Sequence, residues 1–152
     1  MIPFMSEELP PSLHTEIERL SAEGDAQAEV GKFEAAIAIY NSAWQLVPEP
    51  KTRWNASTWL MAAIGDAAFL GGYGGTALDA LRFSMHCPGG IGNPFLHLRL
   101  GQVLFDRDEL DGAADELARA YMGGGPEVFA QEDPRYMAFL STRIDLKARG
   151  VR

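Results

Sequence analysis

The chain has 152 residues, a length typical of one domain, and 47% of them are apolar, which excludes a disordered chain. Thirteen Lys and Arg residues stand against 21 Asp and Glu residues, so the formal net charge is −8. Phosphate binding needs clustered cations, so this charge argues against nucleic acid as a direct ligand and favours a basic partner. The single cysteine, Cys87, excludes an intrachain disulfide and is typical of a reducing compartment.

We expect residues 1 to about 11 to form an extended lead, and this segment lacks the basic start and long apolar run that are typical of a signal peptide. The apolar run from Trp59 to Gly65 ends at Asp66 and is too short to span a bilayer. We therefore expect a soluble, cytoplasmic protein that does not enter a membrane.

The first helix is predicted from Pro10 and Pro11, which favour a helix start, to Val30. Ser12 is its expected N-cap. Gly24 lies in the middle of this helix, where a glycine costs about 1 kcal/mol relative to alanine. We therefore expect a neighbouring helix to approach closely at Gly24.

Apolar residues at three- and four-residue steps predict a second helix from Phe33 to Val47, and Pro48 marks its end. The same periodicity predicts five further helices, at about 51–70, 76–85, 94–105, 110–122 and 133–147. Trp54 is expected on the packed stripe of the third helix. Asn93 is expected to cap the fifth helix, with Pro94 in its first turn.

Three mid-helix glycines recur along the chain, Gly24, Gly65 and Gly101, separated by 41 and then 36 residues. A helix-turn-helix unit of about 34 residues is the tetratricopeptide period. The residues of the first repeat that match such a unit are Gly31, Phe33, Ala36, Tyr40, Ala43 and Pro48. The matching residues of the later repeats are Ile64, Gly65, Gly72, Ala77, Leu81 and Ser84, and then Leu100, Gly101, Ala113, Leu117 and Ala120. Over residues 17–126 the chain therefore resembles the tetratricopeptide repeat family.

This resemblance implies an all-α fold in which three antiparallel helix pairs form a right-handed superhelix, with a C-terminal capping helix. Within a single domain the units would cover about 12–48, 51–88 and 93–126, and the cap about 133–148. The bulky aromatic residue that is usual early in each unit is here Leu20, Met61 and His97. Gly74 and Gly75 stand where helix formers are usual, so the start of the fourth helix is expected to be frayed or shifted.

No residue pattern in the chain indicates catalysis. His14, His86 and His97 lie in no metal-ligand spacing, so we expect neither a metal nor a cofactor. His86 and Cys87 are adjacent and could act as a general base beside a nucleophilic thiol. We favour the alternative, in which this segment is a polar loop with a small buried thiol. The glycine-rich segment 89–93 lacks the Lys-Ser or Lys-Thr of a P-loop and is either a compact loop or a partner-contact loop. We therefore expect a protein that is not an enzyme.

Stacked helix pairs form a concave face, which in tetratricopeptide proteins commonly holds the ligand. Mapping the family onto this chain gives eleven partner-binding candidates: Glu18, Asp25, Glu29, Asn55, Trp59, Asp66, Phe69, Phe95, Gln102, Phe105 and Asp106. The set is acidic, is interleaved with aromatics and contains no Lys or Arg. The alternative is that the aromatics are core and the acids a solvated face. We favour Trp59 as an anchor, because Trp54 already supplies an aromatic to the packed side of the same helix.

The whole chain, and the segment from His86 to Leu100 in particular, resembles small bacterial tetratricopeptide proteins encoded beside secreted toxins. This resemblance implies an immunity protein that binds and neutralises a cognate toxin, whose domain would be basic. The alternative is an adaptor or chaperone that holds a peptide segment of a partner protein. The sequence leaves open which of these roles applies and what the oligomeric state is.

Overall fold

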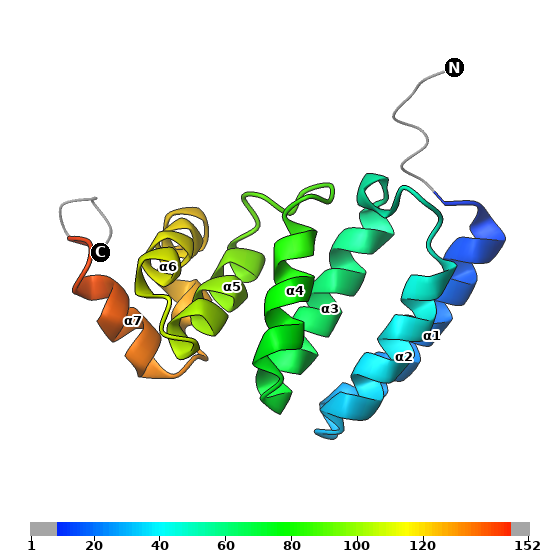
Figure 1. Ribbon diagram of the computed structural model, residues 1–152, viewed down its shortest axis with the longest axis horizontal. Helices are drawn as coiled ribbons and strands as arrows, with labels where there is room; N and C mark the ends of the chain where they lie inside the picture. Colours follow the sequence, from blue (N-terminus) through cyan, green and yellow to red (C-terminus); the bar gives the residue numbers. More distant parts are fainter. Residues whose placement is uncertain (1–8, 147–152) are drawn as a thin grey trace, which may run out of the picture. The chain divides into compact units, whose positions relative to one another are not determined.

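A computed structural model describes residues 9–146. Residues 1–8 of the expected lead and residues 147–148 of the expected cap lie outside this range. The described part contains seven α-helices and no strand, which confirms the all-α fold (Figure 1). The helices are α1 (Pro11–Glu29), α2 (Phe33–Leu46), α3 (Asn55–Gly71), α4 (Gly74–Ser84), α5 (Pro94–Asp106), α6 (Leu110–Gly124) and α7 (Pro134–Ser141). The superhelix and the single domain stay predictions.

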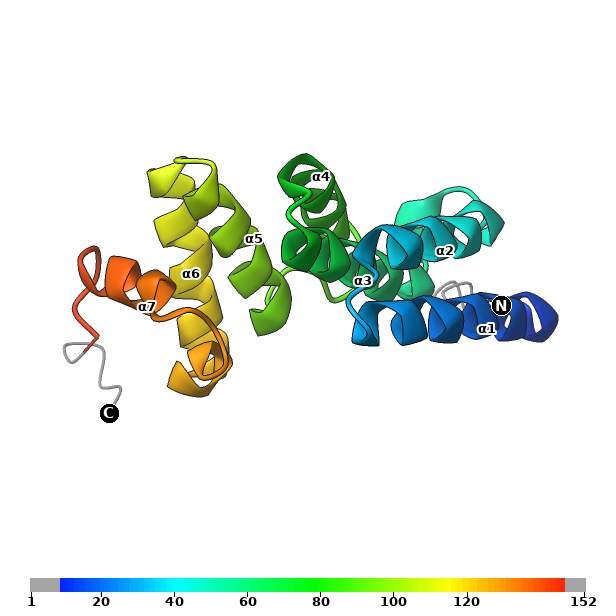
Figure 2. The same ribbon diagram turned by 90° about the horizontal axis from the view of Figure 1, so that it is seen from below.

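The chain divides between Ile91 and Gly92 into two compact units. In unit 1, α1 packs against α2 and α3 against α4, and α3 also contacts α2, as Figures 1 and 2 show. Two apolar clusters hold these helices together, one around Tyr40 and Ile64 and one around Ile17 and Leu60. In unit 2, α5 packs against α6, and α6 contacts α7 and a 3₁₀ turn, η3 (Pro126–Phe129).

The three mid-helix glycines occupy the same place in each helix pair. A Cβ on Gly65 would lie 2.7 Å from Leu81 Cδ2, and a Cβ on Gly101 would lie 2.7 Å from Leu117 Cδ2. A Cβ on Gly24 would likewise meet the ring of Tyr40. In every case the large residue follows its glycine by 16 positions. The close approach expected from the sequence is confirmed, and it fixes the same register in all three pairs.

Replacing Gly101 by leucine should lower the free energy of unfolding by about 1–3 kcal/mol, because the new side chain has no room beside Leu117. The control is Gly75→Ala in α4, where an added methyl group would meet no neighbouring side chain within 4 Å. This control should be neutral or stabilising by about 0.4–1 kcal/mol. Urea unfolding followed by circular dichroism measures both values. Equal stability of Gly101→Leu and the wild type would contradict the close packing of α5 on α6.

The turn inside each helix pair also repeats. Gly31, Gly72 and Asp108 all have a positive φ, of 79°, 86° and 65°. Their separations of 41 and 36 residues equal those of the mid-helix glycines. In each turn the N–H of the next residue donates to a carbonyl five positions back, and the pairs are Lys32 to Gln27, Tyr73 to Ala68 and Glu109 to Leu104. Aspartate tolerates this left-handed conformation better than most non-glycine residues, so the third turn keeps the geometry without glycine.

Two expected helix starts were wrong. Pro10 and not Ser12 is the residue before α1, because Pro11 suits the first helical position and has no N–H to be capped. Trp54 is extended and precedes α3, after a 3₁₀ turn, η2 (Lys51–Arg53). Its indole Nε1–H donates to Pro48 O at 2.8 Å, and its side chain is buried in the cluster around Ile17 and Leu60 although its backbone is not helical.

The boundaries of two other helices also differ from the expectation. Because Gly72 reverses the chain, Gly74 and Gly75 lie inside α4, although glycine is a weak helix former. The burial of Ala77 and Leu81 offsets that weakness. The last helix begins after Asp133, whose carboxylate accepts from Arg135 N, and ends at Ser141, six residues before the predicted end.

At the start of unit 2 the sequence and the structure agree. Asn93 Oδ1 accepts from Phe95 N and Leu96 N, as expected of an N-cap. His97 is buried, and its Nε2 accepts from Gly92 N at 2.9 Å, so the proton lies on Nδ1 and is donated to a Glu116 oxygen at 2.6 Å. His97 therefore joins Gly92, which precedes α5, to α5 and α6, in place of the aromatic that is usual there.

Candidate functional site

A groove between α1 and α3, which we call the α1–α3 groove, brings together three of the sequence-predicted site residues. It has a volume of about 400 Å³ and is lined by Glu18, Ser21, Ala22, Asp25, Trp59 and Ala63. None of the described residues that line it is Lys or Arg. Trp59 is partly buried against the Ile17 cluster, so part of its ring is held by the core and part faces the groove.

The acids on α1 and α3 surround the buried phenol of Tyr40. Its hydroxyl donates to Asp25 Oδ1 at 2.7 Å. Burial raises the pKa of Tyr40, and the negative charges of Asp25, Asp66 and Glu29 raise it further. Because these charges act on one group, three predicted site residues from two helices form one region of negative potential.

The other predicted residues of unit 1 lie along the same helices. Glu18 is exposed and pairs with His14 one turn earlier, with Glu18 Oε2 3.2 Å from Nε2. Asn55 is exposed in the first turn of α3, whereas Phe69 is partly buried near its end. Asn55, Trp59, Asp66 and Phe69 follow three-, four- and seven-residue steps, so they share one face of α3.

In unit 2 the predicted site residues are largely engaged by the chain itself. Gln102 has no exposed surface, so it offers nothing for direct contact with a partner. The ring of Phe105 packs against Tyr136 and Phe139 of α7, with centroid distances of 5.5 and 4.9 Å. Asp106 accepts from Arg135 and from the Tyr136 hydroxyl, both at 3.0 Å. The negative charge expected at Asp106 is therefore offset by a cation.

A buried polar network, which the sequence did not predict, explains why Gln102 is engaged. One guanidinium nitrogen of Arg99 donates to Gln102 Oε1 and to Glu132 Oε1, both at 2.7 Å. The Gln102 amide donates to the same Glu132 oxygen at 2.8 Å. Arg99 also lies over the ring of Phe95, with 5.0 Å between the guanidinium carbon and the centroid. The sequence feature that could have indicated this network is Arg99, an arginine inside the apolar run of residues 95–100.

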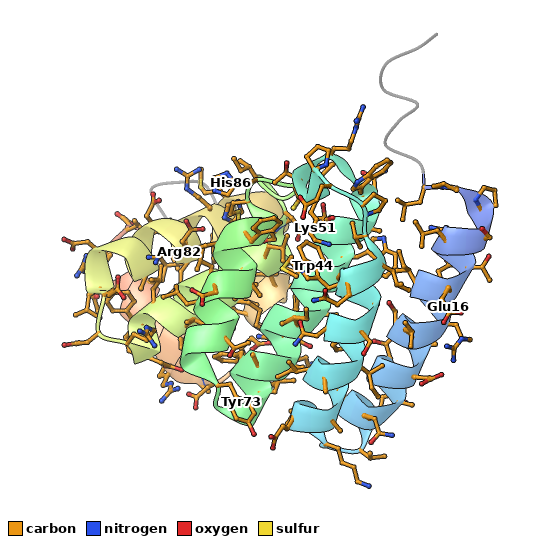
Figure 3. The ribbon with its side chains drawn as sticks, turned by 45° about the vertical axis from the view of Figure 1, so that its right-hand side comes forward. Glu16, Trp44, Lys51, Tyr73, Arg82 and His86 are labelled. Atoms are coloured by element: carbon orange, nitrogen blue, oxygen red, sulfur yellow. The ribbon has the colours of Figure 1, made fainter. Side chains whose placement is uncertain are left out.

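A second hollow, which we call the α2–α4 pocket, was also missed from the sequence. It has a volume of about 520 Å³ and lies between α2, α3, α4 and the linker that joins α2 to α3, residues 47–54. Its lining residues are Asn41, Trp44, Glu49, Pro50, Lys51, Thr52, Met61, Ile64, Thr76, Asp79, Ala80 and Phe83. Figure 3 shows Lys51 and Trp44 next to each other at this site. Phe83 was the available signal, because this large aromatic residue of the fourth predicted helix is not among the residues that match a repeat unit.

Cys87 lies at the end of unit 1, one residue after the exposed His86 (Figure 3). The thiol is buried and donates to Phe83 O at 3.5 Å. Burial raises the pKa of the Cys87 thiol to about 11. Since only the thiolate is a good nucleophile, this environment does not activate Cys87 at neutral pH.

The reaction of Cys87 with iodoacetamide at pH 8 should therefore be about a hundredfold slower in the folded protein than in urea, where the pKa returns to about 8.5. The folded rate should rise about tenfold for each pH unit between 8 and 10, because the thiolate fraction rises in that proportion. Mass spectrometry of the alkylated chain measures both rates, and Cys87→Ala supplies the blank. Equal rates in folded and unfolded protein would contradict the raised pKa, and a faster rate in the folded protein would indicate an activated nucleophile.

Within residues 9–146 no three His, Cys, Asp or Glu side chains gather in a way that could hold a metal ion. In the same range no helix combines the length and the apolar character needed to cross a bilayer. Comparison of the sequence with protein-family models gives no match, and no curated protein matches it significantly.

Proposed function

We propose that the protein is a non-enzymatic interaction module of the tetratricopeptide type that binds a basic protein partner in the α1–α3 groove. The observation that carries the proposal is the groove itself, where part of the Trp59 ring lies beside Glu18 and Asp25 and none of the described lining residues is a cation. The repeated register of the glycines and turns supports the tetratricopeptide type.

The two parts of the groove would contribute differently to binding. The carboxylates around Tyr40 raise the local concentration of a basic partner and accelerate its association, an effect that salt screens. Trp59 would be desolvated on contact, and buried aromatics slow dissociation. A groove of about 400 Å³ suits a few side chains of a folded partner.

The specific role that we propose is immunity: neutralisation of a cognate secreted toxin in the cytoplasm. It is supported by the resemblance of residues 86–100 and of the whole chain to small proteins encoded beside such toxins. It is also supported by the net charge of −8, because a basic toxin domain would be attracted to this chain. One cognate partner is then expected rather than a set of peptides.

The experiment captures the partner from the source cell, identifies it and measures binding kinetics at two ionic strengths. Glu18→Lys should slow association by about tenfold at low salt, and the defect should shrink at high salt. Glu34→Lys is the control, because it makes the same charge change at an exposed position of α2 outside the groove. If both variants associate equally, or if Glu18→Lys binds as the wild type does, the α1–α3 groove is not the site.

A further inference from the structure

The α2–α4 pocket has an apolar interior built from three helices of unit 1. Met61 and Ile64 of α3 line it together with Ala80 of α4. Trp44 of α2 and Phe83 of α4 meet edge to face, with 5.4 Å between the centroids and 89° between the planes. Both rings are only partly buried, so their apolar surface remains accessible.

Among the described residues that line the pocket, the only cation is engaged by the chain itself. Lys51 Nζ donates to Trp44 O at 2.8 Å and to Val47 O at 2.7 Å. These carbonyls belong to the C-terminal end of α2, where the helix dipole is negative. The ammonium also lies 4.8 Å from the centroid of the Trp44 ring. Its charge is thus largely offset by the helix end that it caps.

The two pocket carboxylates have no such partner. Glu49 and Asp79 are exposed, and within residues 9–146 neither forms an ion pair or a side-chain hydrogen bond. They come from different parts of the chain, the linker and α4, and line the same hollow. Asn41, Thr52 and Thr76 add neutral polar groups that suit hydrogen bonds to a peptide backbone.

We propose that the α2–α4 pocket binds a segment of a partner protein in which a large aromatic or aliphatic side chain is flanked by basic residues. The apolar side chain packs on the accessible surfaces of Trp44 and Phe83, where an aromatic ring can adopt offset or edge-to-face geometry. The flanking cations pair with Glu49 and Asp79. This site is formed by other residues than the α1–α3 groove, and the inference does not rest on the proposed function.

The experiment titrates the isotope-labelled full chain with the tripeptide acetyl-Arg-Phe-Arg-amide and follows the NMR spectrum. Saturable shifts are expected at the Trp44 indole N–H and at the amides of Ile64 and Ala80. The tripeptide acetyl-Glu-Phe-Glu-amide, with the same apolar side chain, should bind at least tenfold more weakly, because the pocket carboxylates repel it.

Asp79→Lys should weaken binding of the basic tripeptide by about fivefold, the size of an exposed ion pair replaced by a repulsion. Glu34→Lys, which is also on an exposed position but outside the pocket, should bind as the wild type does. Shifts confined to the α1–α3 groove, equal binding of both tripeptides, or no saturation would overturn the inference. So would shifts of pocket residues that depend on protein concentration alone, because the occupant would then be a second copy of this chain.

Discussion

Replacing Arg99 by methionine should lower the free energy of unfolding by about 3–5 kcal/mol. The side chains of Arg99 and Glu132 are only 9% and 17% exposed, so removal of the arginine leaves a carboxylate with little water to solvate it. Methionine fills most of the arginine volume, and the loss therefore measures the charge and the hydrogen bonds rather than a cavity. Urea unfolding followed by circular dichroism gives the value.

Two further variants separate this electrostatic effect from packing. Arg143→Met removes a similar side chain whose partner, Asp111, is fully exposed, and it should cost no more than about 1 kcal/mol. The triple variant Arg99→Met/Gln102→Leu/Glu132→Leu removes both charges together with the buried amide that they bond, and it should recover much of the lost stability. If Arg99→Met and Arg143→Met cost the same, or if the triple variant is as unstable as Arg99→Met, the buried pair does not act as described.

Trp59→Ala should weaken binding of the native partner by about 2 kcal/mol or more, which is roughly a thirtyfold rise in the dissociation constant. The change should appear in the dissociation rate, because the indole contributes desolvated contact rather than long-range attraction. Surface-based kinetics with the captured partner measures both rates, after circular dichroism has shown that the helices are retained.

The matched control for this aromatic residue is Tyr73→Ala, since Tyr73 is 42% exposed in the turn between α3 and α4 and does not line the α1–α3 groove. It should leave both rates unchanged. A wild-type dissociation rate for Trp59→Ala would contradict the anchor role. A loss of equal size in Tyr73→Ala would show that the contact surface lies elsewhere on unit 1.

Periodicity and spacing predicted the helices because the apolar stripes are regular and the turns repeat. The sequence also located the close helix contacts, since a glycine inside a helix, as at Gly65, needs a compensating neighbour. Predictions from local sequence failed where tertiary contacts determine the backbone conformation. Trp54, at the start of the third predicted helix, is extended, with its ring in the Ile17 cluster and its indole N–H on Pro48 O. Asp108 adopts the left-handed conformation of the third turn, where the sequence has no glycine to indicate it.

The candidate site was predictable in unit 1 and less so in unit 2. The repeat pattern predicted that Glu18 and Trp59 lie on the same side of the first and third helices, and in the structure both line the α1–α3 groove. In unit 2 the chain engages its own predicted site residues, as the bonds of Gln102 and Asp106 show. No spacing rule could pair Gln102 with Glu132, because 30 residues separate them and the contact depends on how the chain returns to α5.

The α2–α4 pocket was missed for a related reason. Trp44 belongs to the apolar stripe of the second predicted helix. Periodicity alone does not show whether a residue at the edge of such a stripe is covered by a neighbouring helix. The pocket lies where α2 and α4 both pack on α3, and the rings of Trp44 and Phe83 meet edge to face there. Such a pocket is a property of helix placement and not of any single segment.

The glycine contacts within each helix pair join residues only 16 positions apart. The entropy lost on closing a loop grows with its length, so these contacts form at a small entropic cost. Helical proteins dominated by such local contacts fold in microseconds to milliseconds. Ribosomes add roughly 5–20 residues per second. In the growing chain, the contacts of one helix pair can therefore form seconds before the next pair has been synthesised.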